Sequence, residues 1–255
     1  MTLSSLKPRP LIAGNWKMNG VSGALDEARA VASALAEKPS VARVALFPPA
    51  TLLHRLSEAV QGGQVLTGGQ DCHGKVNGAH TGDVSADMIA DAGGALVICG
   101  HSERRTDHGE TSSEIAAKAE AAVAAGLEPI VCVGETLETR EAGDAVGFVV
   151  AQVRDSLAPA LAGRAFSVAY EPLWAIGTGR TASVDNIVEM HAAIRAELIA
   201  LFGEQGRGVP ILYGGSVKPE NAGEILSAPE VGGALVGGAS LKAKDFLAII
   251  GALQA

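Results

Sequence analysis

Short apolar runs alternate with longer amphipathic, alanine-rich stretches along the whole chain. Runs such as ALVIC and PIVCV are apolar at every position, which is typical of strands covered on both faces of a parallel sheet. The apolar runs predict eight strands: Leu11–Ala13, Val41–Phe47, Gln64–Gly68, Ala95–Cys99, Pro129–Val133, Ser167–Tyr170, Pro210–Tyr213 and Ala234–Val236.

The stretches between these runs have the spacing of helices, with apolar residues recurring every three or four positions. They predict helices at Ser22–Glu37, Ala50–Val60, Ser85–Ala92, Thr111–Ala125, Ala145–Leu161, Ser183–Leu201, Pro219–Leu226 and Lys244–Leu253. Ser183 is a plausible N-cap of its helix. One apolar face of that helix is predicted to consist of Val184, Val188, His191, Ile194 and Leu198.

The alternation of strands and helices indicates an α/β fold, because a strand that pairs in parallel with the previous one must return over a crossover helix. An open doubly wound sheet is the alternative. However, no GxGxxG sequence follows the first strand, and the 255 residues contain no linker and no shift of composition. We therefore expect a closed eight-stranded parallel β/α barrel that forms a single domain over residues 1–255.

Composition and charge narrow the classes of function. Apolar residues make up 47% of the chain and charged residues 19%, which provides for a large core. The net charge of −8 argues against a nucleic-acid partner, since such binders usually carry a basic face. No apolar run approaches the roughly 18 residues of a membrane span, and the N-terminus does not resemble a signal peptide. We expect a cytoplasmic protein with no membrane partner.

The cysteines suggest neither disulfides nor a metal site. There are three, Cys72, Cys99 and Cys132, and they are far apart, as expected in a reducing compartment. Asp71, Cys72 and His73 are potential ligands, but adjacent residues do not easily converge on one ion. The sequence therefore predicts no metal.

Polar residues and glycines gather just after the predicted strands. In a β/α barrel, the face at which the strands end carries the active site. These residues are Asn15 and Lys17 after the first strand, His101 after the fourth, Glu171 after the sixth, Ser216 after the seventh, and Gly237 and Gly238 after the eighth. Their common position on one rim predicts an active site.

Six segments of the sequence resemble those of a known family, and they occur in the same order and with matching spacing, which makes the resemblance specific. GNWKMN (14–19), CGHSERR (99–105), CVGE (132–135), AYEPLWAIGTG (169–179), YGGSV (213–217) and LVGGASL (235–241) resemble the signature segments of the triosephosphate isomerase family. The resemblance covers essentially the whole chain. It implies a homodimeric TIM barrel, without metal or organic cofactor, that interconverts dihydroxyacetone phosphate and D-glyceraldehyde 3-phosphate in glycolysis and gluconeogenesis.

The resemblance also implies roles for individual residues. Glu171 matches the carboxylate that moves a proton between two carbons, and His101 matches the neutral electrophile, a pairing for which this family is the standard example. A helix N-terminus after His101 would lower the proton affinity of its imidazole. Lys17, with Asn15 beside it, would stabilise negative charge on the substrate.

Two further assignments stay open at this stage. Glu103 matches an acid that pairs with the catalytic lysine or relays protons, but a helix-surface ion pair with Arg104 is the competing interpretation. Cys132 is expected near Glu171, where we interpret it as packing that shapes the pocket of the base and not as a nucleophile.

Small residues at three loop tips are predicted to bind the phosphate through backbone N–H groups. These residues are Gly177, Ser216, Gly237 and Gly238. The segment after Glu171 is predicted to be a lid that protects the enediolate from water. Its residues are Pro172, Trp174, Ile176, Gly177, Thr178 and Gly179.

Residues 70–83 form a polar, glycine-rich excursion after the third strand, with an Asn77–Gly78 turn at its tip. The matching loop of the family inserts into the neighbouring subunit, and Thr81 matches a residue near the other subunit's site. A floppy surface loop is the alternative. His80 and Asp83 depart from the common family pattern, which leaves the fine contacts of the interface open.

Fold alone does not fix function, so two alternatives remain. Another phosphosugar enzyme of this architecture would keep the phosphate-binding glycines and change Glu171 and His101. A catalytically silent phosphate-binding barrel would be expected to lose Glu171 or Lys17. All three side chains are present, which favours the isomerase.

Overall fold

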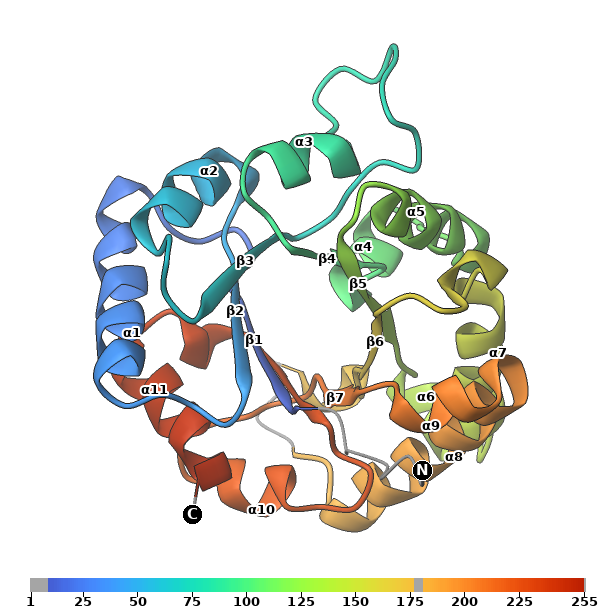
Figure 1. The fold of residues 1–255 in the computed structure, drawn as a ribbon. Coiled ribbons are helices and arrows are strands. Elements are labelled where there is room, and N and C mark those ends of the chain that lie inside the picture. Colours follow the sequence, from blue (N-terminus) through green and yellow to red (C-terminus); the bar gives the residue numbers. More distant parts are fainter. Residues whose placement is uncertain (1–8, 177–180, 255) are drawn as a thin grey trace, which may run out of the picture.

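The chain forms a closed barrel of eight parallel strands, each paired with its neighbours in sequence (Figure 1). The structure is a computed structural model that describes residues 9–176 and 181–254. The strands are β1 Leu11–Asn15, β2 Arg43–Phe47, β3 Val65–Gly69, β4 Leu96–Cys99, β5 Glu128–Val133, β6 Ser167–Tyr170, β7 Ile211–Tyr213 and β8 Gly233–Val236. Pairing of β1 with β8, from Leu11 opposite Gly233 to Gly14 opposite Val236, closes the barrel. The predicted fold class is confirmed.

Helices surround the barrel on the outside (Figure 1). The α-helices are α1 Leu25–Glu37, α2 Ala50–Ala59, α3 Ala86–Asp91, α4 Ser102–Asp107, α5 Ser112–Ala124, α6 Leu137–Glu141, α7 Ala145–Ser156, α8 Val184–Phe202, α9 Glu204–Gly208, α10 Ala222–Leu226 and α11 Ala243–Gly251. The 3-10 helices are η1 Ser22–Ala24, η2 Pro159–Leu161, η3 Leu173–Ala175, η4 Gly238–Ser240 and η5 Ala252–Gln254.

Successive strand residues belong to two different cores. Leu11, Ala13, Ala45, Phe47, Leu96, Ile98, Ile130, Cys132, Ala169, Leu212 and Leu235 fill the barrel interior. Intervening residues such as Ile12, Val44 and Val97 pack outward in the cluster that contains the helix side chains. Because side chains alternate between the faces of a strand, both sides of the sheet are apolar. This explains why runs such as ALVIC and PIVCV are apolar at every position.

Several predicted helices are shorter than expected, for local reasons. The stretch Ala145–Leu161 divides into α7 and η2, with Pro159 as the first residue of η2. Proline is tolerated in the first turn of a helix but not in its interior. The helix predicted from Pro219 begins only at Ala222. The short helices α6 and α9 were not predicted.

The buried face of α8 is rotated relative to the prediction. His191, Ile194 and Leu198 are fully buried as expected, together with Ile187 and Met190. Val184 and Val188 are only partly buried. The cap is as predicted, because the Ser183 hydroxyl accepts the amide N–H of Asn186 at 3.2 Å.

The long loop between β3 and α3 stands away from the barrel wall (Figure 1). Within residues 9–176 and 181–254, no helix combines the length and the apolarity that crossing a membrane requires.

Candidate active site

The strand ends bring many of the predicted site residues to one cavity of about 300 Å³. Asn15 ends β1, while Ser216 follows β7 and Gly237 follows β8. The cavity is lined by Asn15, Lys17, His101, Ile176, Gly214, Gly215, Ser216, Val217, Lys218, Leu235, Gly237, Gly238 and Ala239. Its only ionisable lining side chains, among the described residues, are two lysines and a histidine. The cavity therefore suits an anionic ligand although the chain as a whole is acidic.

Glu171 is 1% exposed and does not line this cavity, but it contacts His101, which does. Its Oε1 is 2.8 Å from His101 Nε2, and its Oε2 accepts the backbone N–H of Ser102 at 3.0 Å. The Ser102 hydroxyl donates to Oε1 at 3.3 Å. Burial raises the proton affinity of Glu171, but the charge and hydrogen bond of His101 and the Ser102 N–H outweigh it, so its pKa lies below the usual value. The carboxylate is held ionised.

Two glycines leave the space that Glu171 occupies. A Cβ at Gly134 would lie 1.8 Å from the backbone oxygen of Glu171, and a Cβ at Gly214 would lie 2.8 Å from its Cγ. The Cys132 thiol is fully buried, and its interaction with Glu171 helps to lower the pKa of that carboxyl. Burial raises the pKa of this thiol well above its ordinary value, so it stays protonated. Cys132 contacts the predicted base, as expected from its place at the end of β5.

The environment of His101 fixes its tautomer. His101 is the N-cap of α4, and its Nδ1 accepts the backbone N–H of Glu103 at 3.2 Å. The ring hydrogen is therefore on Nε2, which faces Glu171. Burial lowers the pKa of His101, but the charge and hydrogen bond of Glu171 raise it by more, and the net shift is upward. The expected downward shift from the helix terminus is thus wrong for this arrangement, because a carboxylate in direct contact dominates.

Lys17 is held in an unusual backbone conformation. Its φ of 54° is in the left-handed region, which is uncommon for a residue with a long side chain. Its N–H donates to Asn15 Oδ1 at 3.0 Å, and Gln70 Nε2 donates to its carbonyl oxygen at 2.8 Å. Such strain is typical of residues that the surrounding structure positions for function.

The structure distinguishes the two interpretations of Glu103. Lys17 Nζ is 2.5 Å from Glu103 Oε1, so the two residues form the expected ion pair. Arg104 instead pairs with Asp71 at 3.1 Å and with Glu110 at 2.6 Å. Glu103 is thus held by Lys17, which lines the cavity.

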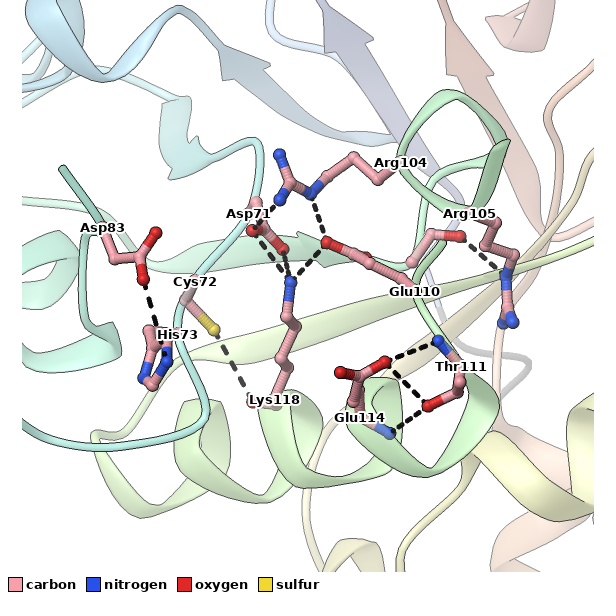
Figure 2. Close-up of polar contacts among 11 residues, drawn as sticks. Asp71, Cys72, His73, Asp83, Arg104, Arg105, Glu110, Thr111, Glu114 and Lys118 are labelled. Carbon is pink, nitrogen blue, oxygen red and sulfur yellow. Dashed lines mark hydrogen bonds and ion pairs between the residues drawn. The ribbon is translucent and has the colours of Figure 1, made fainter. Parts of the chain in front are cut away.

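A polar network fastens α4, which carries Glu103, to α5 and to the base of the β3–α3 loop (Figure 2). Lys118 Nζ lies 2.8 Å from Asp71 Oδ1 and 2.6 Å from Glu110 Oε1, and Arg104 bridges the same two acids. Burial raises the pKa of Asp71, although Lys118 opposes this. This network could not be predicted from local patterns, since its members are scattered over 47 positions.

Three of the four predicted phosphate-binding residues line the cavity. Ser216 and Gly237 are half-buried and Gly238 is exposed, and all three line the cavity. Gly237 precedes η4, and its carbonyl oxygen accepts the Ser240 hydroxyl at 2.7 Å. Gly177 lies outside the described residues, as do Thr178 and Gly179 of the predicted lid.

The first part of the predicted lid is anchored by a residue that sequence reasoning missed. Pro172 caps η3, and Trp174 Nε1 donates to Glu135 Oε1 at 2.9 Å. Glu135 is fully buried and also accepts from Tyr170 at 3.0 Å and Arg140 at 2.8 Å. Glu135 follows the buried strand β5 after one intervening residue, Gly134, much as Glu171 follows β6. This position at a strand end was the signal from which Glu135 could have been predicted.

Thr81 is not part of this site in a single chain. It is exposed in the loop between β3 and α3, and the cavity lining does not include it.

Comparison with known proteins agrees with the geometry. The family model described as triosephosphate isomerase matches residues 10–253. A triosephosphate isomerase of Caulobacter vibrioides is 84% identical over 253 residues, covering 99% of this chain and 100% of that protein. The one from Ruegeria sp. is 54% identical, covering 97% and 99%. The crystal structure of triosephosphate isomerase from Bartonella henselae has a TM-score of 0.90 at 43% identity, covering 97% of this chain and 100% of that one. The chain therefore belongs to the triosephosphate isomerase family.

Proposed function

We propose that this chain interconverts dihydroxyacetone phosphate and D-glyceraldehyde 3-phosphate, with Glu171 as the base and His101 as the hydrogen-bond donor to the substrate oxygens. The observation that carries this assignment is the 2.8 Å contact between Glu171 and His101 beside a cavity with two lysines. The reaction takes a proton from the carbon next to a carbonyl, passes through an enediolate, and returns the proton to the neighbouring carbon.

Glu171 has to move before it can act. In the structure its carboxylate is bound to His101 and Ser102 and does not line the cavity outlined by the described residues. A substrate oxygen that accepts the Nε2 hydrogen of His101 replaces Glu171 at that nitrogen. The released carboxylate can then turn toward the substrate carbon. Its burial keeps water away from the base, so the proton is returned to substrate and not lost to solvent.

His101 donates as a neutral imidazole in this scheme. Its Nδ1 is occupied by the Glu103 N–H, and a second ring proton would have to displace that hydrogen bond. The upward shift of its pKa comes from Glu171, so the shift is lost when the carboxylate leaves for the substrate. A neutral donor matches the proton affinity of an enediolate oxygen more closely than a cation does. Lys17 and Asn15, which line the same cavity, stabilise the negative charge on that oxygen.

The phosphate is bound by the opposite side of the cavity. Ser216, Gly237 and Gly238 offer backbone N–H groups there, at the end of the barrel where β/α barrels commonly bind phosphate. Lys17 adds a positive charge. The lid begins at Pro172 and Trp174, of which Trp174 is held by Glu135, and Ile176 reaches the cavity. Gly177, Thr178 and Gly179 complete the lid in this proposal, with the Gly177 N–H on the phosphate.

The base assignment is tested by the isomerisation rate of Glu171→Asp with glyceraldehyde 3-phosphate in a coupled assay. The shorter side chain withdraws the carboxylate by about 1 Å, and misplacement of this size costs roughly 100-fold in turnover. Glu220→Gln is the matched control, because Glu220 is an exposed glutamate in the loop after β7. A Glu171→Asp enzyme as fast as the wild type would show that another group is the base.

We further propose that the chain is one domain over residues 1–255 and forms a homodimer in the cytoplasm. The β3–α3 loop supports the dimer, because it protrudes and carries Val76, an apolar side chain that is 59% exposed (Figure 1). Thr81 of this loop would lie near the active site of the second subunit. A cavity of about 710 Å³, lined by Gln70, Asp71, Lys75 and Arg104 among others, lies at the loop's base and could receive the loop of a second copy. Sedimentation velocity measures the mass of the assembly, and a monomer at micromolar concentration would contradict the proposal.

A further inference from the structure

Arg105, on α4, bonds to the backbone at the ends of two neighbouring strands. Its Nε donates to the Gly100 carbonyl at 3.0 Å, just after β4, and its Nη2 donates to the Cys132 carbonyl of β5 at 2.8 Å. The side chains of Arg104 and Arg105 leave α4 in different directions (Figure 2). We propose that Arg105 is a positioning residue of the isomerase reaction, a role that rests on the proposed function: it holds the end of β4 in place against the end of β5.

The Cys132 carbonyl faces β4 at a level where β4 has already ended. At the start of β5, the Glu128 N–H donates to the carbonyl of Ala95, on the β4 side, at 3.0 Å. Because alternate residues of a parallel strand bond to the same neighbouring strand, Cys132 faces the β4 side as well. A buried carbonyl without a donor is costly, and Arg105 supplies the donor that a further residue of β4 would have supplied.

The two carbonyls lie next to the groups that are proposed to move the proton. Gly100 directly precedes His101, whose Nε2 is 2.8 Å from Glu171 Oε1. Cys132 interacts with the Glu171 side chain, and the Glu171 N–H donates to the carbonyl of Val133, the next residue of β5, at 2.7 Å. A shift of β5 against β4 would therefore move the base relative to the imidazole.

Two helices outside the barrel hold the guanidinium itself. Its Nη1 donates to the Ser112 hydroxyl at the start of α5 at 3.2 Å, and its Nη2 donates to the buried Ser156 hydroxyl at the end of α7 at 3.0 Å. Within residues 9–176 and 181–254, no carboxylate forms an ion pair with Arg105. Burial lowers the pKa of Arg105 and the nearby Cys132 and Glu171 oppose this, but a guanidinium keeps its charge in proteins. Its planar donors thus serve carbonyl and hydroxyl oxygens only.

Arg105→Lys tests this role, because a lysine keeps the positive charge but lacks the planar fork that reaches both carbonyls. A 1 Å misplacement costs roughly 100-fold in turnover, so a shift of about half that size should lower kcat roughly tenfold. KM should change less than about twofold, since an interaction that matters only in the transition state leaves substrate binding unaltered. None of the four contacts of Arg105 is to a residue that lines the cavity. The assay is the coupled one with full-length protein, and circular dichroism checks the fold.

Arg43→Lys is the matched control. Arg43 joins the start of β2 to the start of β5, with Nη1 3.1 Å from Glu128 Oε1, so it also links two strands but at the opposite end of the barrel. It should lose stability in urea and keep the kcat and KM of the wild type. Ser156→Ala is a milder second variant, which keeps Arg105 and removes one of its contacts. It should lower kcat about threefold, through a smaller displacement.

Three results would overturn the proposal: full kcat in a folded Arg105→Lys enzyme, an equal fall of kcat in Arg105→Lys and Arg43→Lys, or a loss confined to KM. If Arg105→Lys does not fold, Ser156→Ala decides, and its full kcat would overturn the proposal. A wild-type chain without isomerase activity would refute the proposed function and this role together. An active wild type with unaffected variants would refute this role alone.

Discussion

Replacing Gly214 with alanine should displace the Glu171 side chain, and so lower the turnover, while leaving the carboxylate itself unchanged. Gly214 directly follows β7, and a Cβ there would lie 2.8 Å from Glu171 Cγ and 3.1 Å from the Tyr170 carbonyl oxygen. Unstrained carbon atoms approach to about 3.5–4.0 Å, so the Glu171 side chain must shift by roughly 1 Å. The backbone of Gly214 is not in the left-handed region, and the added methyl group is therefore the whole perturbation.

A shift of about 1 Å at a catalytic group costs roughly 100-fold in turnover, which equals about 2.7 kcal/mol of transition-state stabilisation. We expect kcat for glyceraldehyde 3-phosphate to fall by this factor, with a much smaller change in KM, because Gly214 is not among the residues proposed to bind the phosphate. Gly223→Ala is the matched control. Gly223 lies in α10, where a Cβ meets no atom within 4 Å, so this variant should keep full activity. Wild-type turnover in a folded Gly214→Ala enzyme would refute the reasoning.

Two further predictions concern stability. Glu135→Gln weakens the buried contacts with Arg140 and Trp174 and should lower the free energy of unfolding in urea by roughly 3 kcal/mol. Glu138→Gln, at an exposed position of α6, should change it by less than about 0.5 kcal/mol, and equal effects would contradict the assignment. Burial lowers the pKa of His191 to about 4 from 6.5, so the unfolded chain binds the proton first as pH falls. The stability that this histidine contributes is complete above pH 6.5 and declines toward pH 4, by about 2 kcal/mol at pH 5. His191→Gln should remove this part of the loss between pH 7 and pH 5, and an unchanged loss would show that His191 is not its source.

The boundaries that the sequence missed have a common cause. Hydrophobic period locates an element but not its last turn, because end residues are decided by backbone hydrogen bonds and caps. β1 was predicted to end at Ala13, but it continues to Asn15 because Gly14 and Asn15 pair with Leu46 and Phe47 of β2. Similarly, the buried face of α8 includes Met190 because of how the helix sits on the barrel, which spacing alone does not reveal.

The site shows the same division. The sequence could propose Glu171, His101, Lys17 and Asn15 because each stands at a strand end within a family segment, and their roles stay predictions. Glu135 and the Asp71–Lys118 pair could not be proposed in this way, since their importance depends on partners far along the chain: 39 positions separate Glu135 from Trp174, and 47 separate Asp71 from Lys118. The upward pKa shift of His101 could not be predicted either, because it results from contact with Glu171. Glu171 is far along the chain, 69 residues after Ser102, the neighbour of His101.

The sequence by itself determined the strand and helix order, the closed barrel and the rim on which the polar residues gather. These features follow from local periodicity and from the rule that parallel strands present their carboxyl ends on one side. Only the tertiary structure decided which oxygen of Glu171 meets which donor and that Lys17 adopts a left-handed backbone. Hydrogen bonds and ligand sets depend on distances of a few ångströms between segments, and those distances exist only once the chain has folded.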